Sequence, residues 1–597
     1  MSNSEFAAQP APASRMQDVA GDAASPAALG RLTRTLARAD RSPKLKAQRK
    51  GVAHLKAAVL AIQARDYANG SARALEALKF DEANGLAWHI LAIAQEKGGH
   101  FEQALQAYDA ALRLLPDETD IAGDLGRLAQ RLGYLEIAEK LYAKGLARSP
   151  GNVEATNNLA CVQRDQGRYS EAIDTLRSLL AVTPETPLLW NTLGTVLSEQ
   201  GEMAGSVVFF DEALRLDPGF SKALYNRANV RQALGDSVQA LIDIDLALDQ
   251  VEEPVEIDTI RMAKALTQIF LGDLANGFET YEVRFSPNLE SAVQFVTNAP
   301  LWDPQDDVAG MRMLVFGEQG LGDEVMFASL LPDLLQAVGP EGHLTVAVER
   351  RMVPLYQRSF PDARIVAHQS VKLGGRVTRR AVLPADEPAF DRWVPVASLY
   401  RRFRKSAAEF PGKIGFMQPD PARVAHWTAV LRAESDLPKV GVLWKSLRME
   451  GSRRRYFSPF ELWAPVLATP GATFVNLQYG DIEEELAQAA EAGLRLWTPP
   501  GINLKDDLDD VAALTATLDL VLGQPNATTN IAAAVGTPWW GLASPDDWTL
   551  FGTDTYPTFP NARAFISDGF GAWEGVMQRL AASLAEWTAE RARGNAA

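Results

Sequence analysis

A glycine-rich stretch that ends in two acids, GEQGLGDE at residues 317–324, has residue types that could bind a phosphate or move a proton. Its glycines do not follow the G-x-G-x-x-G order of dinucleotide-binding loops, and no Gly-Lys-Ser/Thr triplet follows as in a Walker loop. Three interpretations stay open: a phosphate-binding loop at Gly320 and Gly322, a catalytic loop with Asp323 and Glu324, or a tight strand-to-helix turn. In the last case Asp323 serves only as the N-cap of the following helix.

A second segment with ligand-binding chemistry is GQPNATTN, at residues 523–530. We expect a helix to start here, and its start is rich in polar side chains. Backbone N–H groups and the helix dipole at such a start favour a phosphate or a diphosphate. The candidate ligand-binding residues of this segment are Asn526, Thr528, Thr529 and Asn530.

Three more residues are candidates for the same ligand. Lys445 lies at the end of the expected strand VGVLWKS, where it could neutralise a phosphate as a point charge, and it is equally well explained as a surface lysine. Arg453 lies in the loop SRRRYFSP, and a guanidinium suits a carboxylate or a phosphate. Gln478 follows another expected strand and could contact a base or a ribose, or could simply pack in the core.

The second half of the chain alternates strands and helices, and these elements must position the candidate residues. This alternation predicts parallel sheets with crossover helices, and it restarts near residue 437, which predicts two Rossmann-like lobes. Ligands of such sheets bind at the carboxyl ends of the strands, here between the lobes. The expected divisions are a linker at 287–310, a first lobe at 311–415, an interlobe segment at 416–436, a second, nucleotide-binding lobe at 437–571 and a C-terminal helix at 572–597.

The first half carries an internal repeat of 34 residues. Three columns of small or turn-forming residues share this period: Gly99, Gly133, Gly167, Gly201 and Gly235; Pro116, Pro150, Pro184 and Pro218; and Ala104, Ala138, Ala172, Ser206 and Ala240. A helix–turn–helix unit of this length is the signature of tetratricopeptide repeats (TPRs). We therefore expect a TPR α-solenoid of about seven units at residues 51–286, followed by the α/β half, and a concave groove on the solenoid.

One polar column suggests what this groove could bind. Its members, again 34 residues apart, are Asp124, Asn158, Thr192 and Asn226. A ladder of such side chains can hydrogen-bond an extended peptide without reading its sequence, so we interpret the column as the binding site of a protein acceptor. The alternative is a set of solvated polar groups on a wet concave face.

Composition narrows the class of protein further. The net charge of -16 argues against nucleic acid as the main partner, and no apolar run is long enough to span a membrane. Residues 1–50 read as a disordered tail followed by a basic segment from Arg31 to Lys50. With one cysteine, Cys161, and no secretory signal, we expect a cytoplasmic location. The six histidines are scattered, and no Asp-x-Asp loop is present, so we expect no metal site.

A resemblance to known proteins runs through most of the chain. The segments GDLANGFETYEVRF, PLWDP, VFGEQGLGDEVMFASLLP, FVNLQYGD and DLVLGQPNATTNIAAAVGTPWWGL resemble bacterial TPR proteins with a glycosyltransferase-like C-terminal half. The overall plan is similar to that of the O-linked N-acetylglucosamine transferase and SPINDLY group, and the C-terminal half resembles heptosyltransferases. The whole layout most resembles flagellin glycosyltransferases of the FlmG type.

This resemblance implies a metal-independent enzyme with a two-lobed GT-B half and no cofactor. It implies transfer of a nonulosonic acid, of the pseudaminic or legionaminic type, from a CMP-sugar to Ser or Thr of flagellin, in support of flagellum assembly and motility. Heptosyltransferases carry an acidic residue in the loop after the first strand, which implies that Asp323 is the base, with Glu324 and Glu318 as neighbours that could substitute for it. Many relatives have Asp-Thr and a histidine near residue 525, where this chain has Gln524, Pro525 and Asn526.

Two competing interpretations remain. A non-catalytic TPR scaffold with a degenerate transferase half is kept open by the altered GQPNATTN segment. A transferase of the lipopolysaccharide type, acting on a lipid acceptor, is disfavoured by the long repeat array and by the lack of a basic membrane face.

Overall fold

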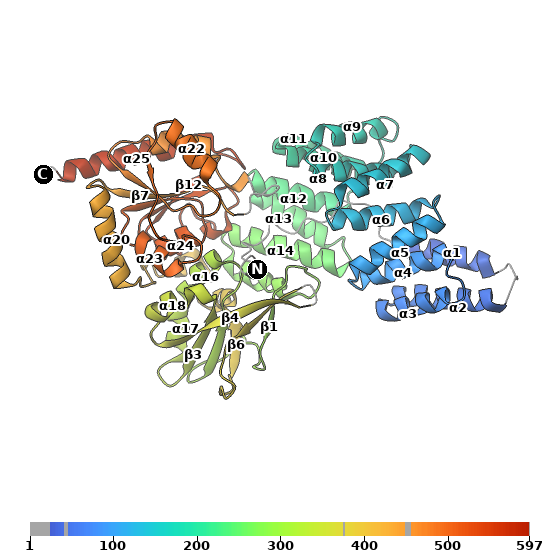
Figure 1. The fold of residues 1–597 in the computed structure, drawn as a ribbon, viewed down its shortest axis with the longest axis horizontal. Coiled ribbons are helices and arrows are strands. Elements are labelled where there is room, and N and C mark those ends of the chain that lie inside the picture. Colours follow the sequence, from blue (N-terminus) through green and yellow to red (C-terminus); the bar gives the residue numbers. More distant parts are fainter. Residues whose placement is uncertain (1–23, 41–45, 374–375, 448–454, 596–597) are drawn as a thin grey trace. The chain divides into compact units, whose positions relative to one another are not determined.

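The structure is a computed structural model that describes residues 24–40, 46–373, 376–447 and 455–595 (Figure 1). The chain divides into two compact units, and the division falls between Asn226 and Arg227. The disordered tail was expected at residues 1–30. Residues 1–23 lie outside the described residues, and the end of the expected tail is helical, because α1 begins at Pro26.

Helix pairs make up the unit that ends at Asn226, as the 34-residue period predicts. Its helices are α1 (Pro26–Asp40), α2 (Lys46–Gln63), α3 (Tyr67–Leu78), α4 (Gly85–Lys97), α5 (Phe101–Leu114), α6 (Thr119–Arg131), α7 (Leu135–Arg148), α8 (Val153–Asp165), α9 (Tyr169–Leu180), α10 (Pro187–Gln200), α11 (Met203–Leu216) and the start of α12 (Ser221–Ala233). The repeat continues in the other unit with α13 (Ser237–Leu248), α14 (Pro254–Phe270) and α15 (Leu274–Thr280). The expected seven TPR units correspond to the pairs from α2/α3 to α14/α15 in the described part of the chain.

The repeated small residues have the roles that the sequence suggests. Every glycine of the 34-residue column lies between the two helices of a pair with a positive φ of 76° to 119°, a conformation that glycine adopts without strain. The alanine column and Ser206 are fully buried, which allows the two helices to approach closely. Gly272, which is 37 residues after Gly235, repeats the turn in the last pair with a φ of 83°.

The last helix pair shares a hydrophobic core with the sheets that follow. Buried residues of α14 and α15, among them Ile269 and Phe278, belong to one cluster with residues of both sheets. The rings of Phe278 and Tyr400 stack with their centroids 4.1 Å apart. A short 3-10 helix, η1 (Tyr281–Phe285), continues directly from α15.

The first sheet is mixed rather than parallel as expected. Its strand order is β1-β5-β4-β3-β2-β6, formed by β1 (Gln294–Val296), β2 (Arg312–Phe316), β3 (His343–Val348), β4 (Ala363–Leu373), β5 (Arg376–Ala381) and β6 (Arg392–Pro395). The difference comes from β4 and β5, which form an antiparallel hairpin that the hydrophobic pattern did not reveal. The segment 287–310 is not a free linker, because β1 pairs with β5 and Trp302 is buried.

The second sheet is entirely parallel, with the order β12-β11-β10-β7-β8-β9. Its strands are β7 (Lys439–Leu443), β8 (Thr473–Asn476), β9 (Leu496–Trp497), β10 (Leu520–Gly523), β11 (Trp539–Ala543) and β12 (Ala562–Ile566). The central strands are buried on both faces, as is usual for parallel sheets. In chain order this sheet grows from β7 to β9 on one side and from β10 to β12 on the other.

Helices complete the packing of both sheets. The first sheet carries α16 (Leu321–Phe327), α17 (Leu331–Val338), α18 (Val353–Ser359) and α19 (Tyr400–Phe403). The second carries α21 (Ala464–Leu467), α22 (Glu483–Glu491), α23 (Leu508–Thr515), α24 (Ala527–Ala534) and α25 (Glu574–Asn595), and α20 (Pro421–Glu434) occupies the segment expected between the lobes. Among the described residues, no helix combines the length and apolar character that crossing a membrane would need.

Candidate functional site at the carboxyl ends of the strands

Two helices that follow strand ends bring the two sheets together. β2 leads through the glycine-rich loop into α16, and β10 leads through residues 524–526 into α24. The first turns of α16 and α24 are in contact, because the side-chain amide of Asn530 donates a hydrogen bond to the carbonyl oxygen of Gly322 at 2.9 Å. A methyl group on Gly322 would lie only 3.1 Å from the backbone carbon of Asn526. The glycine-rich loop and the GQPNATTN segment, which this bond joins across 208 residues of sequence, therefore form one site.

Asp323 is in the third position of α16, where its carboxylate accepts a hydrogen bond from the backbone N–H of Gly320 at 3.1 Å. It is not the N-cap, as the turn interpretation had it, because the helix begins earlier, at Leu321, and Gly320 is the N-cap. The Asp323 side chain is largely buried, with 6% of the residue exposed. Burial raises the pKa of Tyr281 and of Tyr400, and the charge of Asp323 adds to this rise, so both phenols are close to the carboxylate.

The loop itself is held in a strained conformation by a buried arginine. Gln319 has a φ of 59°, which is unusual for a residue other than glycine and is typical of functional sites. Arg379 of β5 donates hydrogen bonds to the carbonyl oxygens of Gly317 at 2.6 Å and of Gln319 at 2.8 Å. The backbone around Asp323 is therefore fixed by contacts from the sheet.

Glu324 belongs to a buried network behind the loop. Its carboxylate contacts Nε2 of His368 at 2.9 Å and accepts the backbone N–H of Glu349 at 3.1 Å. Burial tends to raise the pKa of Glu324, but the hydrogen bond and charge of His368 and the charge of Arg379 outweigh it and hold the pKa below its usual value. The residue stays a catalytic candidate, but these contacts give it a structural role.

Glu318 connects the loop to the segment after the repeats. Arg284 of η1 donates two hydrogen bonds to the Glu318 carboxylate, at 2.9 and 3.1 Å, and both side chains are almost completely buried. The backbone N–H of Ala397 donates a third hydrogen bond to Glu318 at 2.8 Å. With its acceptor sites in use, Glu318 anchors the loop rather than substituting for Asp323.

The start of α24 has the expected capping geometry. Asn526 is the N-cap and accepts the N–H of Thr529, while the hydroxyl oxygen of Thr529 accepts the N–H of Asn526. Thr528 and Thr529 are buried, so these two hydroxyls do not face solvent. Thr529 therefore shapes the helix start, and the groups that could meet a ligand are the side chains and N–H groups of the first turn.

Three buried polar atoms near this start lack a hydrogen-bond partner within the described chain. They are Nδ2 of Asn526, Oε1 of Gln524 and Nε1 of Trp444. Gln524 and Trp444 follow β10 and β7, which are adjacent strands in the sheet, and both residues are at least 98% buried. Buried polar groups are rarely left without a partner, and a polar ligand could supply what these lack.

The remaining candidates for the ligand are placed differently. Gln478 uses all its polar capacity inside the protein: it accepts the N–H groups of Trp444 and Lys445 and donates to the carbonyl oxygens of Lys445 and Tyr479. No polar atom of the Gln478 side chain is therefore left for the predicted contact with a ligand. The side chain instead fixes the loop that carries Lys445. The Lys445 ammonium pairs with Glu485 of α22. Arg453 lies outside the described residues.

An acidic pair that the sequence analysis missed follows β11. Asp546 accepts hydrogen bonds from Ser544 at 2.6 Å and from Tyr456 at 3.2 Å, and Asp547 accepts the N–H and hydroxyl of Thr549. Burial raises the pKa of Asp547 to about 6. The sequence contained a signal for this pair. The acids of SPDDW come directly after an expected strand, and ligands bind at the carboxyl ends of strands.

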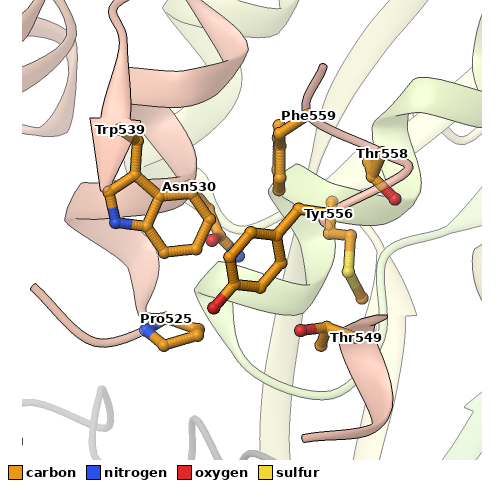
Figure 2. A pocket seen from close by; sticks show the side chains of 8 residues that line it. Pro525, Asn530, Trp539, Thr549, Tyr556, Thr558 and Phe559 are labelled. Atoms are coloured by element: carbon orange, nitrogen blue, oxygen red, sulfur yellow. The ribbon is translucent and has the colours of Figure 1, made fainter. Parts of the chain in front are cut away.

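A small pocket lies between these elements. Its lining includes Met326 of α16, Asn530 of α24 and Tyr556. Figure 2 shows the Tyr556 ring beside Trp539, with its hydroxyl directed towards Pro525. That hydroxyl is buried and has no partner among the described residues.

Three members of the polar column of the repeats, Asp124, Asn158 and Thr192, are buried, and Asn226 is half-buried. Asp124 contacts His89 at 2.8 Å, Thr192 donates to Asn157, and Asn226 donates to Asn191 at 3.0 Å, each across 35 residues. Asn158 is 2% exposed and accepts from the neighbouring Asn157 at 3.1 Å. The alternative of solvated polar groups is wrong for Asp124, Asn158 and Thr192, which are buried. The hydrogen bonds of Asp124, Thr192 and Asn226 join the first helices of successive repeats, and the binding of a protein acceptor at this column stays a prediction.

Comparison with known proteins agrees with the helix pairs. Family models described as tetratricopeptide repeat match residues 87–122, 124–184, 157–221 and 209–242. Human tetratricopeptide repeat protein 7B is 32% identical over 115 residues, which cover 19% of this chain and 14% of that protein. A crystal structure of a TPR protein from Parabacteroides merdae aligns with 40% of this chain and 93% of its own at 17% identity, and its TM-score of 0.34 is too low to carry an argument.

The fold and the repeats thus define a TPR protein with a C-terminal region built on two sheets. Protein FlbA of Caulobacter vibrioides is 48% identical over 573 residues, which cover 96% of this chain and 95% of that protein. The chain belongs to the FlbA family.

Proposed function

We propose that the protein is a protein O-glycosyltransferase that binds flagellin through its TPR half and transfers a nonulosonic acid from a CMP-sugar to Ser or Thr. In this reaction Asp323 takes the proton of the acceptor hydroxyl, whose oxygen attacks the anomeric carbon. The bond from that carbon to the phosphate oxygen breaks, and CMP leaves with the electron pair. The observation that carries the proposal is the contact of α16 with α24, which brings the acidic loop next to the helix start with unpaired polar groups.

The order of the second sheet supports a nucleotide site at this helix start. When its strands are numbered 1 to 6 in chain order, from β7 to β12, their order in the sheet is 3-2-1-4-5-6. This is the order of doubly wound Rossmann sheets. Such sheets bind nucleotides where the order reverses, which here is between β7 and β10. Trp444 and Gln524, with their unpaired polar atoms, follow these two strands, and the N-terminus of α24 suits the CMP phosphate. This arrangement is what a GT-B second lobe would need.

A second candidate, a non-catalytic scaffold, is favoured by one observation. Several side chains predicted to serve catalysis or ligand binding, namely Glu324, Gln478, Thr529 and Lys445, direct their polar atoms to partners within the protein. The location and the flagellin partner belong to the proposal and rest on the resemblance of the sequence to flagellin glycosyltransferases.

The deciding experiment is the intact mass of flagellin from cells that carry Asp323→Asn. Asparagine keeps an acceptor for the N–H of Gly320 but cannot take a proton, so we expect flagellin to lose its sugar-sized mass increments. Glu341→Gln, an exposed acid of the same sheet region, is the matched control and should leave the mass unchanged. Isothermal titration with CMP should give equal affinity for the natural protein and Asp323→Asn. Flagellin of unchanged mass in the Asp323→Asn strain would contradict the proposed reaction and favour the scaffold.

A further inference from the structure

The N-terminal helix α1 is amphipathic and covers part of the repeat array. Leu29, Leu32 and Leu36 are buried, with 2%, 9% and 1% of each residue exposed, and they recur at intervals of three and four residues on one face. They belong to one hydrophobic cluster with residues of α2, α4 and α6. The opposite face carries exposed Arg31 and Arg34.

The reach of α1 shows that it does not simply cap the end of the solenoid. A capping helix contacts the neighbouring repeat only, because each repeat of a solenoid contacts its immediate neighbours. Arg31 instead forms an ion pair with Asp120 at 3.0 Å, and Asp120 is in the first turn of α6, two helix pairs beyond α2. Helix α1 therefore packs on α2 and reaches as far as the first turn of α6.

The array next to α1 has an acidic edge. Asp120 and Glu154 are 34 residues apart, so they occupy the same position in the first turns of α6 and α8. Burial raises the pKa of Glu154, and the nearby charges of Asp124 and Asp120 raise it further, while the charges of Arg127 and Arg31 oppose the rise. This edge is electrostatically complementary to a basic helix such as α1.

We propose that the array surface beneath α1 is a docking site for an amphipathic helix of a protein partner, and that α1 occupies this site in the free protein. The partner helix would present large apolar residues at the spacing of Leu29, Leu32 and Leu36, and a basic residue opposite Asp120. Helix-in-groove recognition works through anchors at this spacing. Because α1 belongs to the same chain, its high effective concentration lowers the apparent affinity of the partner until α1 is displaced. The identity of the partner as the flagellin acceptor rests on the proposed function, but the docking site does not.

The test uses the full chain with Leu32→Glu and Leu36→Glu, which places charges on the buried face of α1 and should release it. The probe is a fluorescein-labelled peptide of residues 24–40, and its binding is followed by fluorescence anisotropy. We expect the released variant to bind the peptide at least ten times more tightly than the natural chain does. The matched control, Thr33→Glu with Thr35→Glu, changes the exposed face of α1 and should behave like the natural chain.

Two outcomes would overturn the inference: no binding by a released variant whose circular dichroism shows intact helices, or equal binding by the released and natural chains. A charge exchange tests the register independently. Asp120→Lys in the released variant should weaken the natural peptide several-fold, and a peptide with Arg31→Glu should recover that loss. Neither readout involves sugar transfer, so a failure here is distinguishable from a failure of the proposed enzyme.

Discussion

The side-chain amide of Asn530 donates to the carbonyl oxygen of Gly322 at 2.9 Å, and this bond joins residues that are 208 positions apart. It fixes the first turn of α24 against the first turn of α16, next to Asp323. The glycine is required by the closeness of this contact, since a Cβ would lie 3.1 to 3.4 Å from atoms of Asn526, Ala527 and Asn530.

Gly322→Val should therefore separate the two helices and abolish the proposed sugar transfer, while the fold of the repeats stays intact. The branched side chain has no room, and the loss of the Asn530 bond costs about 1 kcal/mol in addition. Flagellin mass and the thermal unfolding of the protein are the measurements. Gly123→Ala in α6, where a Cβ meets nothing within 4 Å, is the control and should transfer sugar normally.

Arg284→Met should destabilise the unit that contains the sheets by about 3–5 kcal/mol, because Glu318 would stay buried without its partner. Urea unfolding followed by tryptophan fluorescence measures the change. Adding Glu318→Gln to Arg284→Met should restore part of the loss. An exposed pair gives the comparison: Arg579→Met, which removes the pair with Asp568, should cost less than about 1 kcal/mol.

Asp547→Asn should stabilise the protein at neutral pH. The carboxyl has a pKa of about 6 in the fold, above its value in the unfolded chain, so stability falls as the pH rises from about 4 to 6 and stays lower above that. Asparagine keeps an acceptor for Thr549 without the charge, and the gain at pH 8 is at most about 3 kcal/mol. Urea unfolding at pH 4, 6 and 8 should show the difference disappearing at pH 4. The exposed Asp554→Asn should show no such trend; a gain that persists at pH 4 would contradict the assigned cause.

Thr192→Val should lower the stability of the array without a specific effect on acceptor binding. The substitution keeps the shape of the side chain but leaves the buried side-chain oxygen of Asn157 without its donor, at a cost of about 1–3 kcal/mol. Thermal unfolding and the affinity for flagellin are measured together. Thr119→Val, at an exposed position, is the matched control. A loss of affinity with unchanged stability would restore the original interpretation of the column as a binding ladder.

Glu485→Gln should tighten CMP binding several-fold, because it releases the Lys445 ammonium from its ion pair for the phosphate. Lys445→Ala should weaken CMP binding, and the effect should shrink at high salt because the interaction is electrostatic. Isothermal titration gives both affinities. Identical affinity in all three proteins would remove Lys445 from the site and leave it as a surface lysine.

The solenoid was predictable because its period reports local packing. Glycine permits the turn and alanine the close helix approach, and both needs recur with each unit, so the sequence carries the architecture directly. The expected strands were also found, since parallel buried strands are short apolar runs. The hairpin of β4 and β5 was missed because its second strand, β5, is polar and arginine-rich and lacks such a run.

The composition of the candidate site depended on the tertiary structure. Spacing alone identified the glycine-rich loop and the start of α24, but only the fold shows that they touch, because the contact joins residues that are 208 positions apart in the chain. The burial of these side chains could not be predicted from the sequence either. Asp124, Thr192 and Gln478 have the residue types of a binding site, but in the fold they are buried and form hydrogen bonds inside the protein. The sequence by itself determined the repeat, the strand ends and the polar residues that follow them, because these depend on neighbours along the chain. Contacts between segments far apart in the chain decided which of those polar groups stay unpaired. Only the tertiary structure contains these contacts.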